Sequence, residues 1–255
     1  VTMQDDGGNV TSTVSSSGSA AATVNTGTFD NTDTLVLAGT DTISVVATAT
    51  TNIDTGSASA SISQTTGHEA VVDATAMADG NELSISGAGD FTITGLVADL
   101  TSTADGGVVD ITSGDVDTQT IALGTGTTGT REVDATAMTD GDVLTLTGSG
   151  SLTLSSDDAD VDAATYAGAI TATVTGTAAA TYTMGTVSSS VDSSNTGGLT
   201  IDAGAMADGQ ELTTSGAGNI EVTNLSADLT STSTGTVDVT MQDDGGNVTS
   251  TVSSS

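Results

Sequence analysis

Carboxylates are the side chains in this sequence whose type and spacing could do chemistry. The 255 residues contain 33 Asp and Glu against one Lys or Arg. An Asp-x-Asp pair on a strand places both carboxylates on one face, about 6 to 7 Å apart, which suits Ca²⁺ when a turn adds carbonyl oxygens. The alternative is a solvated acidic turn, so we expect either no cofactor or locally bound calcium. The candidate ligands are Asp5, Asp6, Asn9, Asp110, Asp115, Asp117, Asp157, Asp158, Asp160, Asp162, Asp243, Asp244 and Asn247.

Catalytic chemistry has no comparable set of residues. The only imidazole is His68 in TTGHEAVV, beside a glycine, which is typical of a turn residue. The sequence contains no H-E-x-x-H, G-x-S-x-G or G-K-[ST] motif, and without Lys neither Schiff-base nor phosphate-loop chemistry is available. We therefore expect that the protein is not an enzyme.

The charge balance also limits the partners. A net charge of −32 excludes binding to nucleic acid, because almost nothing can neutralise phosphates, and it disfavours anionic membrane surfaces. No apolar run approaches the roughly 20 residues that span a bilayer, so we expect no membrane insertion in this segment. The absence of Cys rules out disulfides and thiolate metal sites.

The elements that would position the carboxylates are short strands. LSISGAGDFTIT, LTLTGSGSLTLS and LTTSGAGNIEVT all alternate apolar and polar residues on each side of a Gly-x-Gly turn. Leu83 and Ile85 therefore share one face of a strand, and Phe91 and Ile93 return to the same face after the turn. Strands and turns alternate in this way along nearly the whole chain, and no stretch has a sustained helical period.

Internal repeats organise the chain at two scales. VDATAMADGNELSISGAG begins at Val72, and related copies begin at Val133 and Ile201. Residues 1–17, VTMQDDGGNVTSTVSSS, are identical to residues 239–255, which gives a long period of 238 residues. We interpret residues 1–255 as one section of a continuous repeat array, cut from a longer chain, with sub-repeats at approximately 29–71, 72–132, 133–200 and 201–255.

Many short strands with this spacing predict an all-β fold, either a β-solenoid or an array of β-sandwiches. Immunoglobulin-type sandwiches usually run near 100 residues and contain large buried aromatics. Here the units are shorter and aromatic residues make up 2% of the chain. The sequence therefore favours a β-solenoid of stacked coils, either a parallel β-helix or a β-roll, in which each coil buries little alone and much when stacked.

VDATAM leading into GNELSISGAGDFTITG resembles the repeats of giant bacterial surface and secreted proteins, including S-layer proteins and repeats-in-toxin adhesins. The repeats-in-toxin nonapeptide G-G-x-G-x-D-x-U-x binds calcium between successive coils. In GTDTI, Asp41 falls in the calcium position of that pattern. Elsewhere the same alignment places Phe91, Leu152 and Ile220 where Asp would stand, which predicts apolar stacking in place of a calcium ladder.

Three other residue types have candidate roles. Paired Thr in ADLTST, NVTSTV, TAT and TYT could form ladders on stacked coils and order water, although their spacing along the sequence is irregular. The alternative is that Thr is used because it favours strands and keeps an exposed strand face soluble. Arg131 is expected either to pair with an Asp of a neighbouring coil or chain or to lie on the surface. The Met of each DA[TG]AM, at Met77, Met138 and Met206, is expected to plug the core at a coil edge.

Together these features predict a structural repeat protein that is secreted to the cell surface or beyond it. It would form a filament, sheath or layer by stacking and by self-association, so its main partner would be copies of itself. One alternative is a calcium-dependent adhesin that binds glycans or another surface. A further alternative is an ice-binding solenoid.

Overall fold

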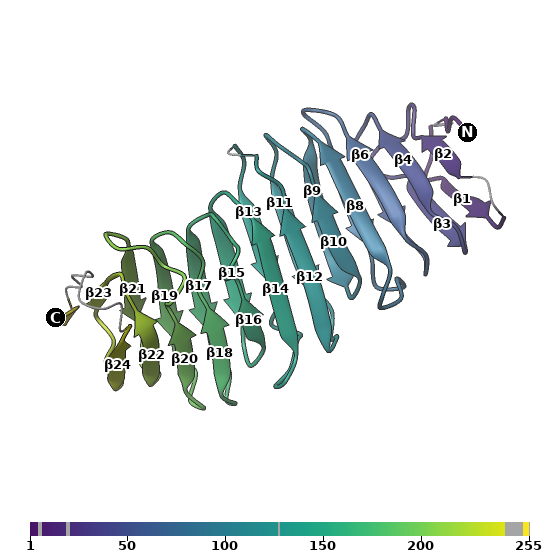
Figure 1. The fold of residues 1–255 in the computed structure, drawn as a ribbon. Helices are drawn as coiled ribbons and strands as arrows, with labels where there is room; N and C mark the ends of the chain where they lie inside the picture. Colours follow the sequence, from purple (N-terminus) through teal and green to yellow (C-terminus); the bar gives the residue numbers. More distant parts are fainter. Residues whose placement is uncertain (5–6, 19–20, 127, 243–251, 255) are drawn as a thin grey trace. The chain divides into compact units, whose positions relative to one another are not determined.

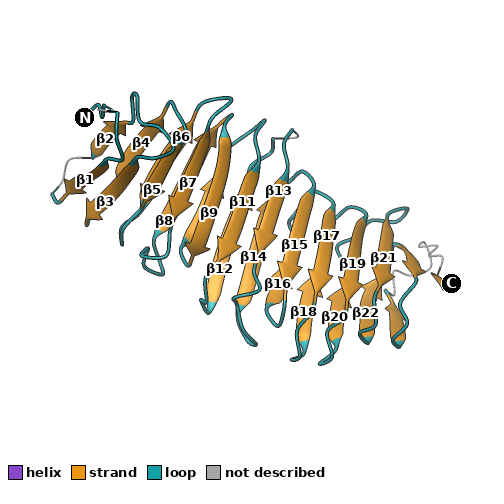
Figure 2. Ribbon diagram, turned by 180° about the vertical axis from the view of Figure 1, so that it is seen from behind, coloured by secondary structure: helices purple, strands orange, loops and turns teal. Residues whose placement is uncertain are grey.

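The structure is a computed structural model that describes all residues except 5–6, 19–20, 127, 243–251 and 255. The described residues form strands joined by turns and loops, and none of them is helical (Figure 2). Within each unit, strands pair in parallel with the strand two places along the chain, as β4 does with β6. The predicted all-β class and β-solenoid are therefore confirmed. The strand pairs found in the described residues are parallel, as a solenoid requires.

The chain divides into two compact units. The first comprises Val1–Gly114 and Ile121–Glu132. Its odd-numbered strands form one sheet, in the order β1-β3-β5-β7-β9-β11, and its even-numbered strands form the other, from β2 to β12 (Figure 1). The strands are β1 (Thr11–Ser16), β2 (Ala22–Asn25), β3 (Thr34–Gly39), β4 (Ile43–Ala47), β5 (Thr51–Asp54), β6 (Ala60–Gln64), β7 (Glu69–Asp73), β8 (Glu82–Gly87), β9 (Asp90–Leu96), β10 (Asp99–Ser102), β11 (Val109–Ser113) and β12 (Thr118–Leu123), whose residues 118–120 belong to the second unit.

The second unit comprises Asp115–Thr120 and Val133–Ser255. Its strands follow the same rule, with odd strands ordered from β15 to β25 and even strands from β14 to β24. The strands are β13 (Arg131–Asp134), which has residues in both units, β14 (Val143–Gly148), β15 (Leu152–Ser156), β16 (Asp160–Asp162), β17 (Ile170–Val174), β18 (Ala180–Thr183), β19 (Ser189–Ser193), β20 (Leu199–Asp202), β21 (Glu211–Ser215), β22 (Ile220–Leu225), β23 (Asp228–Ser231), β24 (Val237–Met241) and β25 (Val252–Ser254).

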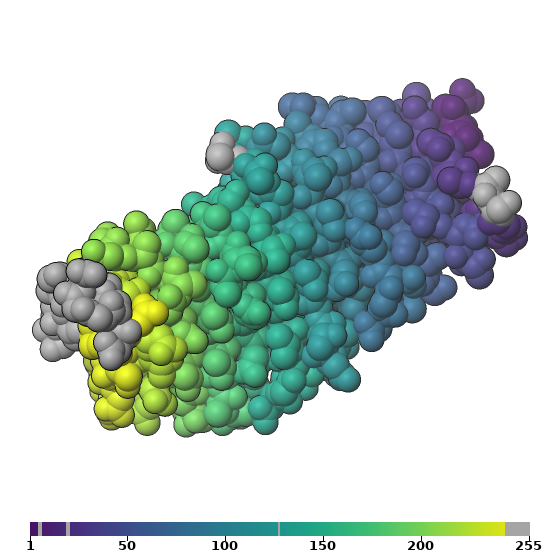
Figure 3. All heavy atoms as spheres, in the orientation of Figure 1, coloured from purple at the N-terminus to yellow at the C-terminus, as the bar shows by residue number. Residues whose placement is uncertain are grey.

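The core of each unit lies between its two sheets and is built from alternate residues of every strand. In the first unit, Leu83 of β8 is buried between its register partners Ala60 and Leu100, and Leu100 pairs in turn with Ile121. Because the pairing is parallel and in register, apolar residues stack on apolar residues from coil to coil. The bands of sequence colour in Figure 3 follow one another in chain order within each unit, as expected for coils that contact their immediate neighbours.

The positions that the nonapeptide alignment assigned to the core are buried. Phe91 begins the apolar face of β9 and is 0% exposed. Leu152 and Ile220 occupy the equivalent positions of β15 and β22, and each is 2% exposed. Apolar packing therefore fills the place that a calcium ligand takes in the repeats-in-toxin pattern.

The first glycine of the Gly-x-Gly turn ends a strand at a point of close approach between coils. Gly87 has φ +101°, and a Cβ added there would lie 2.0 Å from the backbone oxygen of Gln64 on the preceding coil. A side chain at this position would also have to adopt a left-handed backbone conformation. Glycine is therefore required here by both space and conformation.

Candidate functional site

Asp and Asn side chains close the turns that follow many of the strands. In the VDATAM turn, Oδ1 of Asp73 accepts the backbone N–H of Thr75 at 3.0 Å and its hydroxyl at 2.6 Å. Such a turn satisfies a backbone donor that the strand pairing leaves open. The sequence repeat thus encodes a turn, and its carboxylate is used for structure. In other turns the Oδ1 atom likewise accepts the backbone N–H of the residue two positions later, at 2.8 to 3.1 Å. These turns are at Asn25, Asp54, Asp134, Asp162 and Asp202.

A large buried side chain follows most of these turns, four residues after the Asp or Asn. Met77, Met138 and Met206 are 3%, 1% and 2% exposed, and each donates its N–H to the alanine carbonyl three residues earlier. Phe29 and Tyr166 hold the same position in their turns. The predicted role of the three methionines, as plugs at the edge of the core, is confirmed.

The acidic group from Asp157 to Asp162 links neighbouring coils through hydrogen bonds. Oδ1 of Asp158 accepts the backbone N–H groups of Thr177 and Ala178 at 2.6 and 2.7 Å. Asp160 accepts the N–H of Thr181 at 2.6 Å, and Asp157 accepts the hydroxyl of Thr175. These oxygens therefore accept hydrogen bonds from the next coil, both in the turn before β18 and in β18 itself.

The other predicted calcium ligands are dispersed or lie outside the described residues. Asp41 is reached by the Ser16 hydroxyl at 3.4 Å, which is long for a hydrogen bond, and Asn9 is exposed. Within the described part of the chain, no group of three His, Cys, Asp or Glu could hold a metal ion. Asp110 lies half-buried on β11, and Asp115 and Asp117 are exposed before β12. Asp5, Asp6, Asp243, Asp244 and Asn247 fall in segments that are not described.

The two basic side chains have different environments. His68 is exposed in the turn between β6 and β7, as its position beside Gly67 predicts. Arg131 is only 4% exposed, so the prediction of a surface residue is wrong. Its Nη2 donates to the carbonyl of Gly126 at 2.6 Å, while its Nη1 has no hydrogen-bond partner among the described residues. The alternation of buried and exposed residues along β13 places Arg131 inward, although no charge pattern in the sequence marks it.

A buried hydroxyl lies near the acidic group in the second unit. Tyr182 is 1% exposed, and its hydroxyl has no hydrogen-bond partner among the described residues. Burial raises the pKa of this phenol above its ordinary value; the carboxylates of Asp157 and Asp160 add to the rise, and the nearby Ser156 hydroxyl opposes it. Tyr182 therefore stays protonated in the folded chain at pH values where an exposed tyrosine ionises.

Hydroxyl side chains form a regular ladder on the odd-numbered sheet of the second unit. The strand register aligns residues that are 17 to 23 positions apart in the sequence, because the turns absorb the differences in coil length. Neighbouring strands in a sheet are about 4.8 Å apart, so the rungs of this row have constant spacing even though the sequence intervals vary. The row consists of Thr153, Thr171, Ser190, Thr213 and Thr230.

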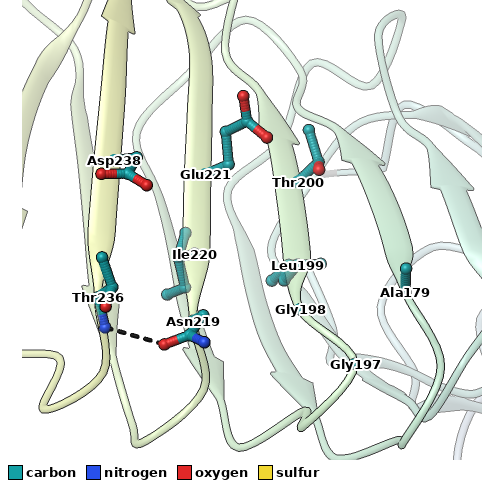
Figure 4. Close-up of a pocket in the computed structure, with 10 residues that line it drawn as sticks. All are labelled: Ala179, Gly197, Gly198, Leu199, Thr200, Asn219, Ile220, Glu221, Thr236 and Asp238. Carbon is teal, nitrogen blue, oxygen red and sulfur yellow. Dashed lines mark hydrogen bonds between the residues drawn. The ribbon is translucent and has the colours of Figure 1, made fainter.

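A surface hollow of the second unit is lined by carboxylate and hydroxyl side chains. It has a volume of about 400 Å³ and lies over β20, β22 and β24, where Thr200, Glu221 and Asp238 occupy neighbouring strands (Figure 4). Asn219 Oδ1 accepts the N–H of Thr236 at 3.1 Å beside it. Its lining contains two carboxylates and no His, Cys or Lys.

Fold and surface together define an acidic β-solenoid in which carboxylates such as Asp73 and Asp158 accept hydrogen bonds within turns and between coils. Comparison with models of protein families, with curated proteins and with solved structures found no match. Among the described residues, no helix has the length and apolar character needed to cross a membrane.

Proposed function

We propose that this chain is a structural repeat protein of the cell surface or extracellular space, where copies of it associate into a filament, sheath or layer. The observation that carries the proposal is the parallel, in-register stacking of the strands, in which each coil covers the strand edges of the coil before it. A parallel strand edge is a template for another strand, so the pairing that joins coils within the chain can also join copies of it.

The composition of the chain lacks the usual means of blocking a strand edge. Natural sheets block their edges with Lys, Pro or a covering helix. This chain has no Pro and no Lys, and its described residues form no helix. The charge of −32 opposes close contact between the acidic faces of two molecules. Association through strand pairing is therefore favoured over lateral collapse.

Self-association can be tested on the purified chain by light scattering and negative-stain imaging over a range of concentration and salt. We expect elongated or layered assemblies, formed more readily at 0.15 M salt or above, where the Debye length falls to about 8 Å and the acidic surfaces repel less. Particles that remain monodisperse and monomeric throughout would contradict the proposal. Immunogold labelling of intact cells would test the proposed location.

Ice binding is a second candidate, favoured by the hydroxyl ladder of the second unit. Its rungs are about 4.8 Å apart, and Ser155 and Thr173 form part of a second row about 7 Å away along the strands. Asp192 interrupts that second row, which is the main observation against a continuous ice-ordering plane. Thermal hysteresis should be lost in Thr171→Tyr and kept in Thr200→Tyr, on the other sheet, if this face binds ice. No hysteresis in the unmodified chain would exclude the candidate.

A further inference from the structure

An Asp-Gly pair forms the tip of the loop that follows the buried Met in each copy of the VDATAM repeat. Each tip is closed by a backbone hydrogen bond across the pair, as from the Asn81 N–H to the Ala78 carbonyl at 3.2 Å. The repeat therefore places the same dipeptide at the same exposed point of the loop. The three pairs, all exposed, are Asp79–Gly80, Asp140–Gly141 and Asp208–Gly209.

An aspartate that precedes glycine can react with its own backbone. The amide nitrogen of the glycine attacks the Cγ atom of the neutral carboxyl group and closes a five-membered succinimide ring. The new N–Cγ bond replaces the Cγ–OH bond, and the hydroxyl leaves with the amide proton as water. Glycine favours this reaction, because it has no Cβ to crowd the ring and it adopts backbone conformations that other residues avoid.

Hydrolysis of the succinimide ring gives one of two products. Water that adds at the Cγ carbonyl restores aspartate. Water that adds at the backbone carbonyl leaves the chain running through Cβ and Cγ, and the former backbone carbonyl carbon becomes a free carboxylate. This product, isoaspartate, has the mass of aspartate but a main chain that is longer by one carbon atom. The water released in the first step balances the water consumed in the second.

The groups that would react have no competing bonds in these loops. Among the described residues, neither the Gly80 N–H nor the Asp79 carboxylate has a hydrogen-bond partner, and this also holds for the other two pairs. A Cβ added at Gly80, Gly141 or Gly209 would meet no atom within 4 Å, so the surrounding space is open. Ring closure requires the peptide plane between the two residues to rotate, which disturbs the bond across the tip but no contact between coils.

Asp105–Gly106 has the same local sequence but a different environment. Both Asp79 and Asp105 lie in an exposed Ala-Asp-Gly segment. The Gly106 N–H donates to the Thr128 carbonyl of the next coil at 3.2 Å, and Oδ1 of Asp105 accepts the Thr128 hydroxyl at 2.8 Å. Both reacting groups are therefore held by the next coil, and rotation of this peptide plane would break bonds between coils.

We propose that Asp79, Asp140 and Asp208 are sites of spontaneous succinimide formation and isoaspartate modification in the folded chain, and that the contacts of Thr128 protect Asp105. The added backbone atom falls in an exposed loop, so the buried Met before it and the flanking strands keep their places. The modification therefore accumulates with age in the folded chain, at one point in each copy of the repeat. This inference is independent of the proposed self-association.

Peptide mapping of the aged full chain tests the proposal. The folded chain would be kept for weeks in mildly acidic buffer, cleaved after glutamate and analysed by mass spectrometry with electron-transfer fragmentation, which distinguishes isoaspartate from aspartate. Cleavage gives residues 70–82, which contain Asp79, and residues 83–132, which contain Asp105. We expect several times more succinimide and isoaspartate at Asp79 than at Asp105. Equal conversion at the two sites, or none at Asp79, would overturn the proposal.

Ageing of the chain in urea separates the effect of the fold from that of the sequence. Once the contacts of Thr128 are lost, Asp79 and Asp105 should convert at similar rates. A preference for Asp79 that persists unchanged in urea would assign it to the neighbouring sequence and would overturn the protection of Asp105 by the fold.

Two matched variants and one control give an independent readout. In Asp79→Asn and Asp105→Asn the same ring forms with loss of ammonia, so conversion appears as a change in mass from amide to acid. Asp79→Asn should convert several times faster than Asp105→Asn in the folded chain, and equal rates would contradict the proposal. Asp79→Ala, which has no Cγ, should abolish the modification of residues 70–82. A signal that remains in this variant would place the reaction at another residue and overturn the assignment to Asp79.

Discussion

Gly87 passes so close to Gln64 that a Cβ at residue 87 would lie 2.0 Å from the Gln64 backbone oxygen. Gly87→Ala is therefore expected to destabilise the fold more than the strain of its left-handed backbone conformation alone would. Gly80→Ala is the matched control, because Gly80 has φ +82° and a Cβ added there would meet nothing within 4 Å. The control should cost about 1 to 2 kcal/mol, and Gly87→Ala about 1 to 3 kcal/mol more. If Gly87→Ala and Gly80→Ala lower the free energy of unfolding in urea equally, the close approach to Gln64 does not affect stability.

The Asp73 turn predicts a difference between removing a carboxylate and replacing it with an amide. Asp73→Ala leaves the Thr75 N–H without its acceptor and should cost about 0.5 to 2 kcal/mol. Asp73→Asn should cost less, because Asn25 closes the equivalent turn with its Oδ1. Asp79→Ala, at an exposed position of the same loop between β7 and β8, is the control and should change stability little. If all three variants unfold at the same urea concentration, the turn bond contributes nothing.

Tyr182 predicts a loss of stability at alkaline pH. Burial raises its pKa in the folded chain, whereas the unfolded chain ionises near pH 10. Its contribution is thus complete below about pH 10 and falls as the pH rises further, by about 1.4 kcal/mol per pH unit. Denaturation followed by circular dichroism at pH 8 and pH 11 should show this loss, and Tyr182→Phe should reduce it. An unchanged loss in the variant would assign the effect to other groups.

Chelation tests the calcium alternative. The Asp158 and Asp160 oxygens are occupied by backbone N–H groups of the next coil, so EDTA is expected to leave the melting temperature unchanged. Isothermal titration with CaCl₂ should likewise show no tight site. A fall of several degrees in EDTA, reversed by calcium, would support the calcium-dependent adhesin.

The solenoid could be predicted from sequence because its signal is local. Alternation around Leu83 and Ile85 gives the strand and its buried face, and the alignment of Phe91, Leu152 and Ile220 identifies core positions on three separate strands. The register between coils has no such local signal, since Thr213 and Thr230 are 17 residues apart and Ser190 and Thr213 are 23 apart.

The function of the acidic residues was the harder part to predict. A carboxylate that closes a turn, such as Asp162, and one that binds a cation have the same spacing in sequence. The partner that distinguishes them is a backbone N–H, which every residue except proline carries. The burial of Arg131 was missed for a related reason, because its partner is the Gly126 carbonyl and not an acidic side chain.

The burial of Arg131 also makes trypsin cleavage a probe of local unfolding. It is the only Lys or Arg in the sequence, so trypsin has one peptide bond to cut, between Arg131 and Glu132 in β13. Because that side chain is 4% exposed, cleavage into residues 1–131 and 132–255 has to await the opening of this strand. The rate of one proteolytic cut therefore measures how often the middle of the array comes apart.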